Sequence, residues 1–429
     1  MQQGSTVGLD PGRRARLQRR TVRVLIVAQV VGTIGVGIAP SIGVLLAGAV
    51  TSDEAWAGLA RTASTLGAAL FGLPLGTLAA RRGRRAALSL GWFAAAAGSA
   101  VIVVAAQRSS ALLLFPGLLL IGCGSAVSLQ SRFAAADLAE PHRAGRDLAL
   151  VVWVGTIGSV LGPNLGVPGD ALGGAVGLNG FAAAFLIATV CLAAAGVVVL
   201  VALRPDPLLV ANAAAATGPA RAGGRRPPRR HVAELAHVLR TNAAARTAVL
   251  TILTAQVVMV AVMTMTPVHL EHQGGSVTVV GLTISLHIAG MYALAPLVGS
   301  VVDRRGARTA VLVGLLVLLV SLLLAALAPD DLRAVVVSLV LLGIGWSFLN
   351  VSGSAMFTRS VPPATRAASQ GGVDASSNLA GAAAAFLAGP LLAATGFSVL
   401  GIVALAMLVP LVVVVGRDRT PDRRTPDDR

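Results

Sequence analysis

Charged residues are scarce in this chain. Only 12% of its 429 residues are charged and 3% are aromatic, whereas 55% are hydrophobic. An ordinary soluble domain carries about 25% charged residues, so this chain lacks the polar surface that a water-soluble fold of its size requires. The mean hydropathy of +0.81 agrees with this. The sequence therefore predicts an all-α membrane protein whose main solvent is lipid.

Lysine is absent, so all 34 basic residues are arginine, and the net charge is +16. A chain without lysine has no Walker-type phosphate loop, and neither a zincin motif nor a nucleophile elbow occurs in a suitable context. We therefore expect no enzyme activity, no cofactor and no metal. The arginines stand in short clusters without interleaved aromatic residues, which argues against binding to nucleic acid.

Cysteine is almost absent as well. Cys123 and Cys191 lie in separate apolar runs and lack the spacing of metal ligands. Both are expected to be small core residues rather than partners in a disulfide or a zinc site.

What the chain has in abundance is long apolar runs, each of at least the roughly 20 residues that cross a bilayer core. Six lie near residues 22–49, 56–80, 86–106, 111–136, 148–168 and 181–203, and six more near 246–270, 276–302, 307–328, 333–357, 367–394 and 398–416. The first run is too long for a cleaved secretory signal, so residues 1–21 are expected to stay as a tail. The sequence predicts bundles at 22–203 and 246–416, and a second tail at 417–429.

The segment 204–245 separates the two sets of runs. Its first part is rich in proline, glycine and arginine and is predicted to be irregular. The stretch HVAELAHVLR that follows has apolar residues at helical spacing, which predicts a short amphipathic helix on the membrane face. Arginines gather in this segment, in both tails and in alternate loops, which predicts that both termini are cytoplasmic.

The two halves repeat each other. GTLAARRGRR begins at Gly76 and GSVVDRRGAR begins at Gly299, each after the second run of its half. Parallel repeats of six spans joined by a long loop are typical of one class of secondary transporter. The repeated loop resembles the signature loop of the major facilitator superfamily, although Ala80 replaces its usual acid.

That resemblance implies two pseudo-symmetric six-helix bundles and a loop that acts as a cytoplasmic latch. The latch residues are then Gly76, Arg81, Gly83 and Arg84 in the first loop, and Gly299, Asp303, Arg304, Gly306 and Arg308 in the second. Without an acid at position 80, the first latch is left in doubt, and Asp374 is an alternative partner for Arg81 or Arg84. The loops also fit a simpler role in setting topology.

The fifth run carries Gly158, Gly162, Pro163 and Gly166, a smooth and kinked helix face suited to close packing. This GxxxGPxxG pattern resembles that of drug–proton exporters in the superfamily. Small-residue faces are common in membrane helices, however. The arginine usual in the fourth helix of such exporters is also missing, because Leu118 stands there.

Ionisable residues inside a span cost about 2.5–3.5 kcal/mol each and are candidates for function. For proton coupling we single out Asp374, His287 and Asp137; the alternatives are an ion pair, a packed core histidine and a solvated helix end. For the substrate cavity the candidates are Gln29, Gln130, Arg132, Gln256, Trp346 and Asn350. The simpler interpretation of the amides is hydrogen bonding between helices.

Taken together, the sequence predicts a monomeric transporter of the inner membrane whose partners are lipid, protons and a small-molecule substrate. The favoured function is proton-coupled export of small apolar or amphipathic compounds by alternating access. Two alternatives stay open. One is proton-coupled uptake or efflux of a specific metabolite, such as a sugar or amino-acid derivative, and the other is a passive channel or membrane sensor.

Overall fold

The computed structural model describes residues 10–51, 55–140, 144–216, 236–361 and 363–417, and within these ranges all regular structure is helical. Twelve candidate membrane spans occur in these ranges, from Gly12–Thr51 to Phe397–Arg417. The prediction of an all-α chain with twelve spans is confirmed. The chain divides into two compact units, Met1–Arg225 with Ser276–Ser285, and Arg226–Gly275 with Leu286–Arg429.

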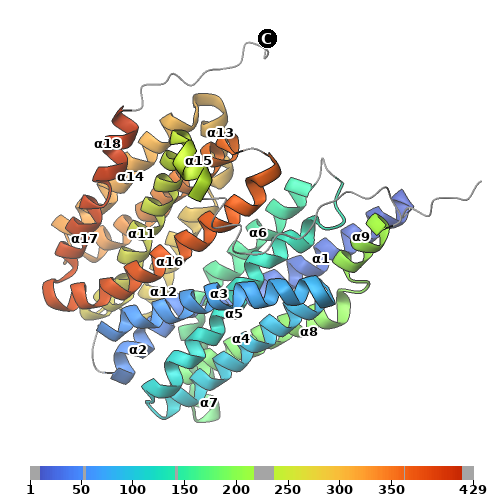
Figure 1. Cartoon of the computed structure of the whole chain (residues 1–429). Coiled ribbons are helices and arrows are strands. Elements are labelled where there is room, and N and C mark those ends of the chain that lie inside the picture. The colour runs from blue at the N-terminus through green and yellow to red at the C-terminus, as the bar shows by residue number, and fades with distance from the viewer. Residues whose placement is uncertain (1–9, 52–54, 141–143, 217–235, 362, 418–429) are drawn as a thin grey trace, which may run out of the picture. The chain divides into compact units, whose positions relative to one another are not determined.

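The first unit contains the first six spans (Figure 1). Its helices are α1 (Pro11–Val36), α2 (Val44–Thr51), α3 (Ala55–Arg82), α4 (Arg84–Gln107), α5 (Ala111–Ala136), α6 (Ala144–Leu161), α7 (Gly166–Val176), α8 (Gly180–Ala202) and α9 (Pro207–Ala216). A π-turn, η1 (Ala39–Gly43), joins α1 to α2, and a 3-10 turn, η2 (Gly162–Leu165), joins α6 to α7. Each turn contains a proline, which breaks the regular ladder of hydrogen bonds in the helix.

Small residues let the helices of this unit approach closely. α4 packs against α5 and α8, and α1 packs against α6 and α8. Trp92 of α4 is fully buried. A Cβ on Gly32 of α1 would overlap the Trp92 ring, so glycine makes room for the largest side chain of this core.

The second unit contains the last six spans except the start of the eighth, because Ser276–Ser285 belongs to the first unit. Its helices are α11 (Ala243–His272), α12 (Val277–Tyr292), α13 (Ala295–Arg305), α14 (Ala307–Leu327), α15 (Leu332–Ser360), α16 (Pro363–Thr395), α17 (Phe397–Ala406) and α18 (Val409–Arg417). α11 packs against α15 and α16, and α14 packs against α15 and α17. Ser321 and Ser338 join α14 to α15 by donating hydrogen bonds to each other's carbonyl oxygens at 2.7 and 2.8 Å.

The linker between the bundles is more ordered than the sequence predicts. Residues 207–216 form α9, so the prediction of an irregular start is wrong for this stretch. Its sequence PLLVANAAAA consists mostly of good helix formers after a proline at the first position, which is where helices accept proline. Of the predicted amphipathic helix, residues 236–241 are helical and 231–235 lie outside the described residues. Val238 in this stretch is buried in the apolar cluster that contains Ala245 and Phe357.

Candidate functional site

The two repeated loops share one backbone geometry. Gly83 precedes α4 with φ 90° and ψ 171°, and Gly306 precedes α14 with φ 86° and ψ 155°. Residues with a Cβ rarely adopt a positive φ of this kind. The repeat seen in the sequence is therefore a repeat of one helix–turn–helix connection, made possible by glycine.

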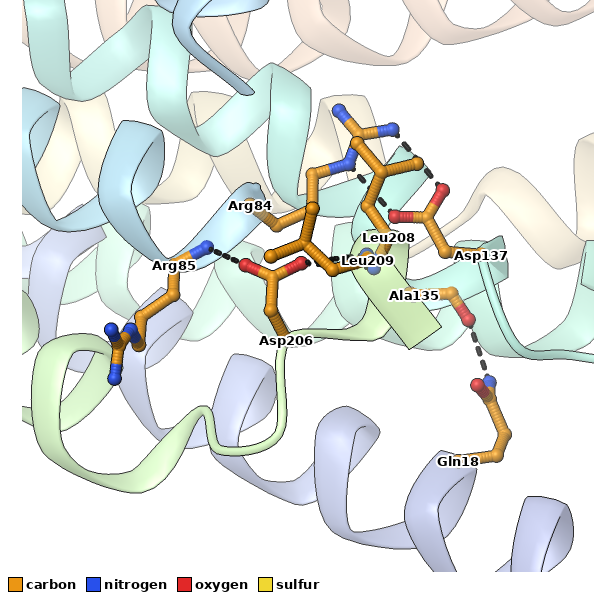
Figure 2. A network of polar contacts seen from close by, with 8 residues as sticks. All are labelled: Gln18, Arg84, Arg85, Ala135, Asp137, Asp206, Leu208 and Leu209. Atoms are coloured by element: carbon orange, nitrogen blue, oxygen red, sulfur yellow. Dashed lines mark hydrogen bonds and ion pairs between the residues drawn. The ribbon is translucent and has the colours of Figure 1, made fainter. Parts of the chain in front are cut away.

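In the first loop, Arg84 forms an ion pair with Asp137 at the end of α5. Nε of Arg84 lies 2.8 Å from Oδ2 of Asp137, and Nη2 lies 3.2 Å from Oδ1. The two side chains are only 15% and 12% exposed, so the pair is largely shielded from water. Figure 2 shows this two-pronged contact, whose fork geometry suits a guanidinium and a carboxylate. The pair fixes the loop to the end of α5 within one bundle.

The same loop is also held by Asp206, which lies in the linker. Oδ2 of Asp206 accepts a hydrogen bond from the backbone N–H of Arg85 at 2.7 Å, at the start of α4. Oδ1 accepts from the N–H groups of Leu208 and Leu209 at 3.0 and 3.2 Å, at the start of α9 (Figure 2). One carboxylate thus caps two helix N-termini, where it also meets the positive ends of both helix dipoles.

The second loop makes a different set of contacts. Asp303 and Arg304 are exposed, and Arg308 donates through Nη2 to the carbonyl oxygen of Val415 at 3.2 Å. That carbonyl belongs to the last turn of α18, the negative end of its dipole, where a cation is stabilising. The basic residues of the two loops therefore secure different helix ends in their own units.

Three of the predicted cavity residues lie in the first unit. Gln29 of α1 donates to the hydroxyl of Ser128 on α5. Gln130 donates to the carbonyl oxygen of Gly72 on α3 at 2.8 Å. The guanidinium of Arg132 lies 4.9 Å from the ring centre of Phe133, a cation–π contact. The two amides join neighbouring helices and are buried.

The second unit contains an amide–aromatic cluster, formed by Gln256, Tyr292 and Trp346. Nε1 of Trp346 donates to Oε1 of Gln256 at 3.2 Å, and its ring meets Tyr292 edge-on at 5.7 Å. Tyr292 is the single tyrosine of the chain. Asn350 lies one turn after Trp346 on the same face of α15 and is half-buried. The structure thus brings Gln256, Trp346 and Tyr292 into contact.

Asp374 lies on the face of α16 that turns toward this cluster. A Cβ on Gly381 would lie 3.2 Å from Nε2 of Gln256, so Gly381 faces α11. Asp374 precedes Gly381 by two helical turns on the same face, about 10 Å along the axis. Its side chain is exposed.

His287 is fully buried in α12. Its Nδ1 lies 2.7 Å from the carbonyl oxygen of Leu339 on α15. Because a carbonyl oxygen only accepts, Nδ1 carries the hydrogen. A Cβ on Gly343 would overlap the His287 carbonyl oxygen, so α12 and α15 meet in backbone contact at this point.

Gly158 and Gly162 of the fifth span face the first span. A Cβ on Gly158 would overlap Thr33 and Val30 of α1, and one on Gly162 would lie 2.6 Å from the α-carbon of Gly37. Gly166 lies against Val277. The stripe therefore acts in helix packing, which is the plainer of the two interpretations of this pattern.

Two residues of these networks escaped the sequence analysis. Asp206 stands in a linker that reads as irregular, and its only signal is an acid before a proline and an apolar run, a helix-start pattern. Tyr292 has no signal beyond its rarity. Among the described residues, no group of three or more His, Cys, Asp or Glu side chains has the arrangement of a metal site.

The fold and these loops define a class, a twelve-span transporter built from two repeated bundles. The family model of the Major Facilitator Superfamily matches residues 24–276 and 247–429. The chain belongs to this superfamily and is a membrane transporter of its type.

Two Bacillus subtilis (strain 168) proteins, the uncharacterized MFS-type transporters YddS and YdeG, are 34% and 36% identical to it. Each comparison covers 94% of this chain, with 92% of the first relative and 94% of the second. The riboflavin transporter RfnT of Brucella anthropi is 29% identical over 93% of this chain and 96% of that protein.

Solved structures show the same fold at low identity. The nucleoside transporter NupG is 15% identical, with a TM-score of 0.67 over 92% of this chain and 97% of that one. A POT family transporter in complex with 5-aminolevulinic acid is 15% identical, with a TM-score of 0.69 over 94% and 97%.

Proposed function

We propose that this transporter exports small amphipathic compounds in exchange for protons, by alternating access of its two bundles. The observation that carries the proposal is the amide–aromatic cluster of Gln256, Tyr292 and Trp346. An aromatic wall beside an amide suits a ligand with an apolar ring and a few polar groups. Gln29, Gln130, Arg132 and Asn350 are proposed to add polar contacts along the path.

Asp374 is the proposed proton carrier. It is an exposed carboxylate on the face of α16 that reaches Gln256 two turns further on. Protonation there changes the charge of the helix that packs against the substrate cluster, so proton and cargo occupancy are coupled through α16. His287 and Asp137 are weaker candidates, because one bonds a carbonyl oxygen in a packed contact and the other is paired with Arg84.

The test is proton flux in proteoliposomes that hold a pH gradient. Lipophilic aromatic cations of several sizes are added to wild type, Asp374→Asn and the control Glu271→Gln, which neutralises an exposed acid at the end of α11. The expected result is dissipation of the gradient by wild type and the control, and none by Asp374→Asn. Gradient loss through Asp374→Asn at the wild-type rate would show that Asp374 does not carry the coupled proton. A lack of response in wild type would exclude the export of such cations as the function of this protein.

A second candidate function is proton-coupled movement of one specific metabolite. The observation that favours it is the 29% identity to a riboflavin transporter along nearly the whole chain. Amide side chains are also suited to hydroxyl groups of such a cargo. Counterflow of labelled riboflavin in the same proteoliposomes tests it, and riboflavin exchange without any response to aromatic cations would favour this candidate over export.

Location and assembly are part of the proposal. We propose that the protein is a monomer in the plasma membrane. We also propose that both termini lie in the cytoplasm, because arginines concentrate in the tails and the linker. Labelling of single cysteines placed in the N-terminal tail and in the linker, from outside intact cells, is expected to fail at both sites. Labelling at either one would overturn this orientation.

A further inference from the structure

A cavity of about 270 Å³ lies beside the N-terminal end of α1, wholly within the first unit. It is smaller than the roughly 300–1,000 Å³ that bury a drug-sized ligand, so it suits a small head group. Its polar lining comes from α1, the segment after α5, and α6, and consists of Arg14, Gln18, Arg19, Arg23, Glu140 and Asp147. None of these residues belongs to the transport path proposed above.

The buried amide of Gln18 indicates which kind of ligand the cavity binds. The residue is 8% exposed, and its Nε2 donates to the carbonyl oxygen of Ala135 and to Oδ2 of Asp147, both at 2.6 Å. Figure 2 shows the first of these bonds. Two acceptors on Nε2 fix the orientation of the amide, so the other atom is the acceptor Oε1. Oε1 is buried and has no hydrogen-bond partner among the described residues. A ligand of this cavity is therefore expected to supply a hydrogen-bond donor.

The charges around the cavity are of both signs. Asp147 and Glu140 provide carboxylates, while Arg19 and Arg23 stand one helical turn apart with exposed side chains. Arg14 is fixed by the carbonyl oxygens of Leu138 and Ala139, both at 2.9 Å. A simple anion would meet the carboxylates and a simple cation would meet the arginines. The complement of this lining is a zwitterion that has an N–H cation and an anionic group.

The cavity also has an apolar part. Val22 and Ile26 follow Gln18 at successive turns of α1, and Leu150 of α6 completes this part of the lining. These residues belong to the first and fifth spans. The arginines occupy the polar end of the span, where such side chains meet lipid head groups. The ligand is therefore amphipathic as well as zwitterionic.

We propose that this cavity binds the head group of phosphatidylethanolamine. The ammonium group donates to Oε1 of Gln18 and pairs with Asp147, and the phosphate pairs with Arg19 and Arg23. The first part of an acyl chain lies along Val22, Ile26 and Leu150. A bound lipid of this kind would join α1 to α6, the two helices that also pack through the glycine stripe.

The first experiment compares head groups on the purified full chain. Dissociation constants are measured by native mass spectrometry for phosphatidylethanolamine, phosphatidylcholine and phosphatidylglycerol with the same acyl chains. Phosphatidylcholine keeps the charge but has no N–H, so it leaves Oε1 of Gln18 unpaired and is expected to bind about tenfold more weakly. Phosphatidylglycerol lacks the cation and is expected to be weaker by a similar factor. Equal affinity for all three lipids would overturn the proposal.

The second experiment uses variants that separate binding from folding. Asp147→Asn keeps an acceptor for Gln18 but removes the charge, and Arg23→Gln removes a phosphate partner; each is expected to weaken phosphatidylethanolamine about fivefold. Arg20→Gln is the matched control, because Arg20 is an exposed arginine of the same helix outside the cavity lining. Equal loss of affinity in all three variants, or in none, would contradict a built site.

Soluble glycerophosphoethanolamine distinguishes a lipid from a dissolved ligand. It is a phosphodiester with the same two charges and no acyl chain, so it is expected to compete poorly with the lipid. Competition at equal concentration would assign the cavity to a water-soluble zwitterion instead of a lipid. The readout is binding alone, so these outcomes do not depend on whether the proposed transport activity is found.

Discussion

The carboxylate of Asp206 lies directly over the α-carbon of Gly83, so that a Cβ on Gly83 would be 2.6 Å from its Cγ. The linker that follows the sixth span thereby closes over the loop between the second and third spans, within the first unit. Glycine is favoured at position 83 for two reasons. It adopts a positive φ, and it leaves room for the carboxylate that caps α4.

Gly83→Ala is expected to destabilise the protein more than Gly396→Ala. Both glycines precede a helix with nearly the same backbone angles, φ 90° with ψ 171° and φ 84° with ψ 175°. Nothing lies within 4 Å of a Cβ on Gly396. Gly396→Ala should therefore cost only backbone strain, about 1–3 kcal/mol, whereas Gly83→Ala adds an overlap worth about 1–3 kcal/mol. Apparent melting temperatures in detergent check the order, and equal values would exclude the close approach of Asp206.

Asp206→Ala is expected to cost about 2 kcal/mol, since it leaves N–H groups at two helix starts without their acceptor. Hydrogen exchange should rise at Arg85, Leu208 and Leu209. Asp10→Ala is the control, because Asp10 caps α1 through one exposed bond to Arg13, and it should cost less than about 1 kcal/mol. Increased exchange at Leu208 and Leu209 without any at Arg85 would show that Asp206 caps α9 alone.

The Arg84–Asp137 pair is expected to show a coupling energy of about 1–3 kcal/mol in a double-mutant cycle of Arg84→Gln and Asp137→Asn. Either single change leaves a half-buried charge without its partner, so the single variants should be nearly as unstable as the double. Arg82→Gln, at an exposed position of the same loop, should have little effect. Additive losses of stability from the two single variants would mean that the ion pair contributes nothing.

Gly158→Ala is expected to destabilise the first unit by at least about 2 kcal/mol, because its Cβ would push α6 away from α1. Gly174 of α7 is the matched helical glycine, with nothing within 4 Å of its Cβ. Gly174→Ala should be neutral or stabilising by up to about 1 kcal/mol. Thermal unfolding measures both, and a neutral Gly158→Ala would separate the glycine stripe from helix packing.

Trp346→Phe is expected to raise the KM for transported cargo about fivefold, since it keeps the aromatic ring but removes the Nε1–H that orients Gln256. Trp153→Phe is the control, because Trp153 is 50% exposed on α6. Initial transport rates in proteoliposomes give both values. An unchanged KM in Trp346→Phe would exclude a role for the amide–aromatic cluster in binding.

The sequence alone determined the twelve spans, the repeat at Gly83 and Gly306, and the helical class. Hydropathy gives the spans and the helical class because transfer into lipid is a sum over about 20 consecutive residues and does not depend on distant partners. The repeat is visible in the two loop sequences themselves. α9 escaped because its composition favours a helix while the surrounding prolines and arginines suggest a loop.

Only the tertiary structure decided which side chains meet. In the sequence, Ala80 leaves the first latch in doubt. In the structure the loop is held by Asp137 and by Asp206, which lies 121 residues beyond Arg85. The unpaired Oε1 of Gln18 and the contact of Trp346 with Gln256 are likewise products of helix packing. A hydrogen bond depends on ångström-scale approach between distant segments, and in a chain whose spans are all apolar no local pattern specifies that approach.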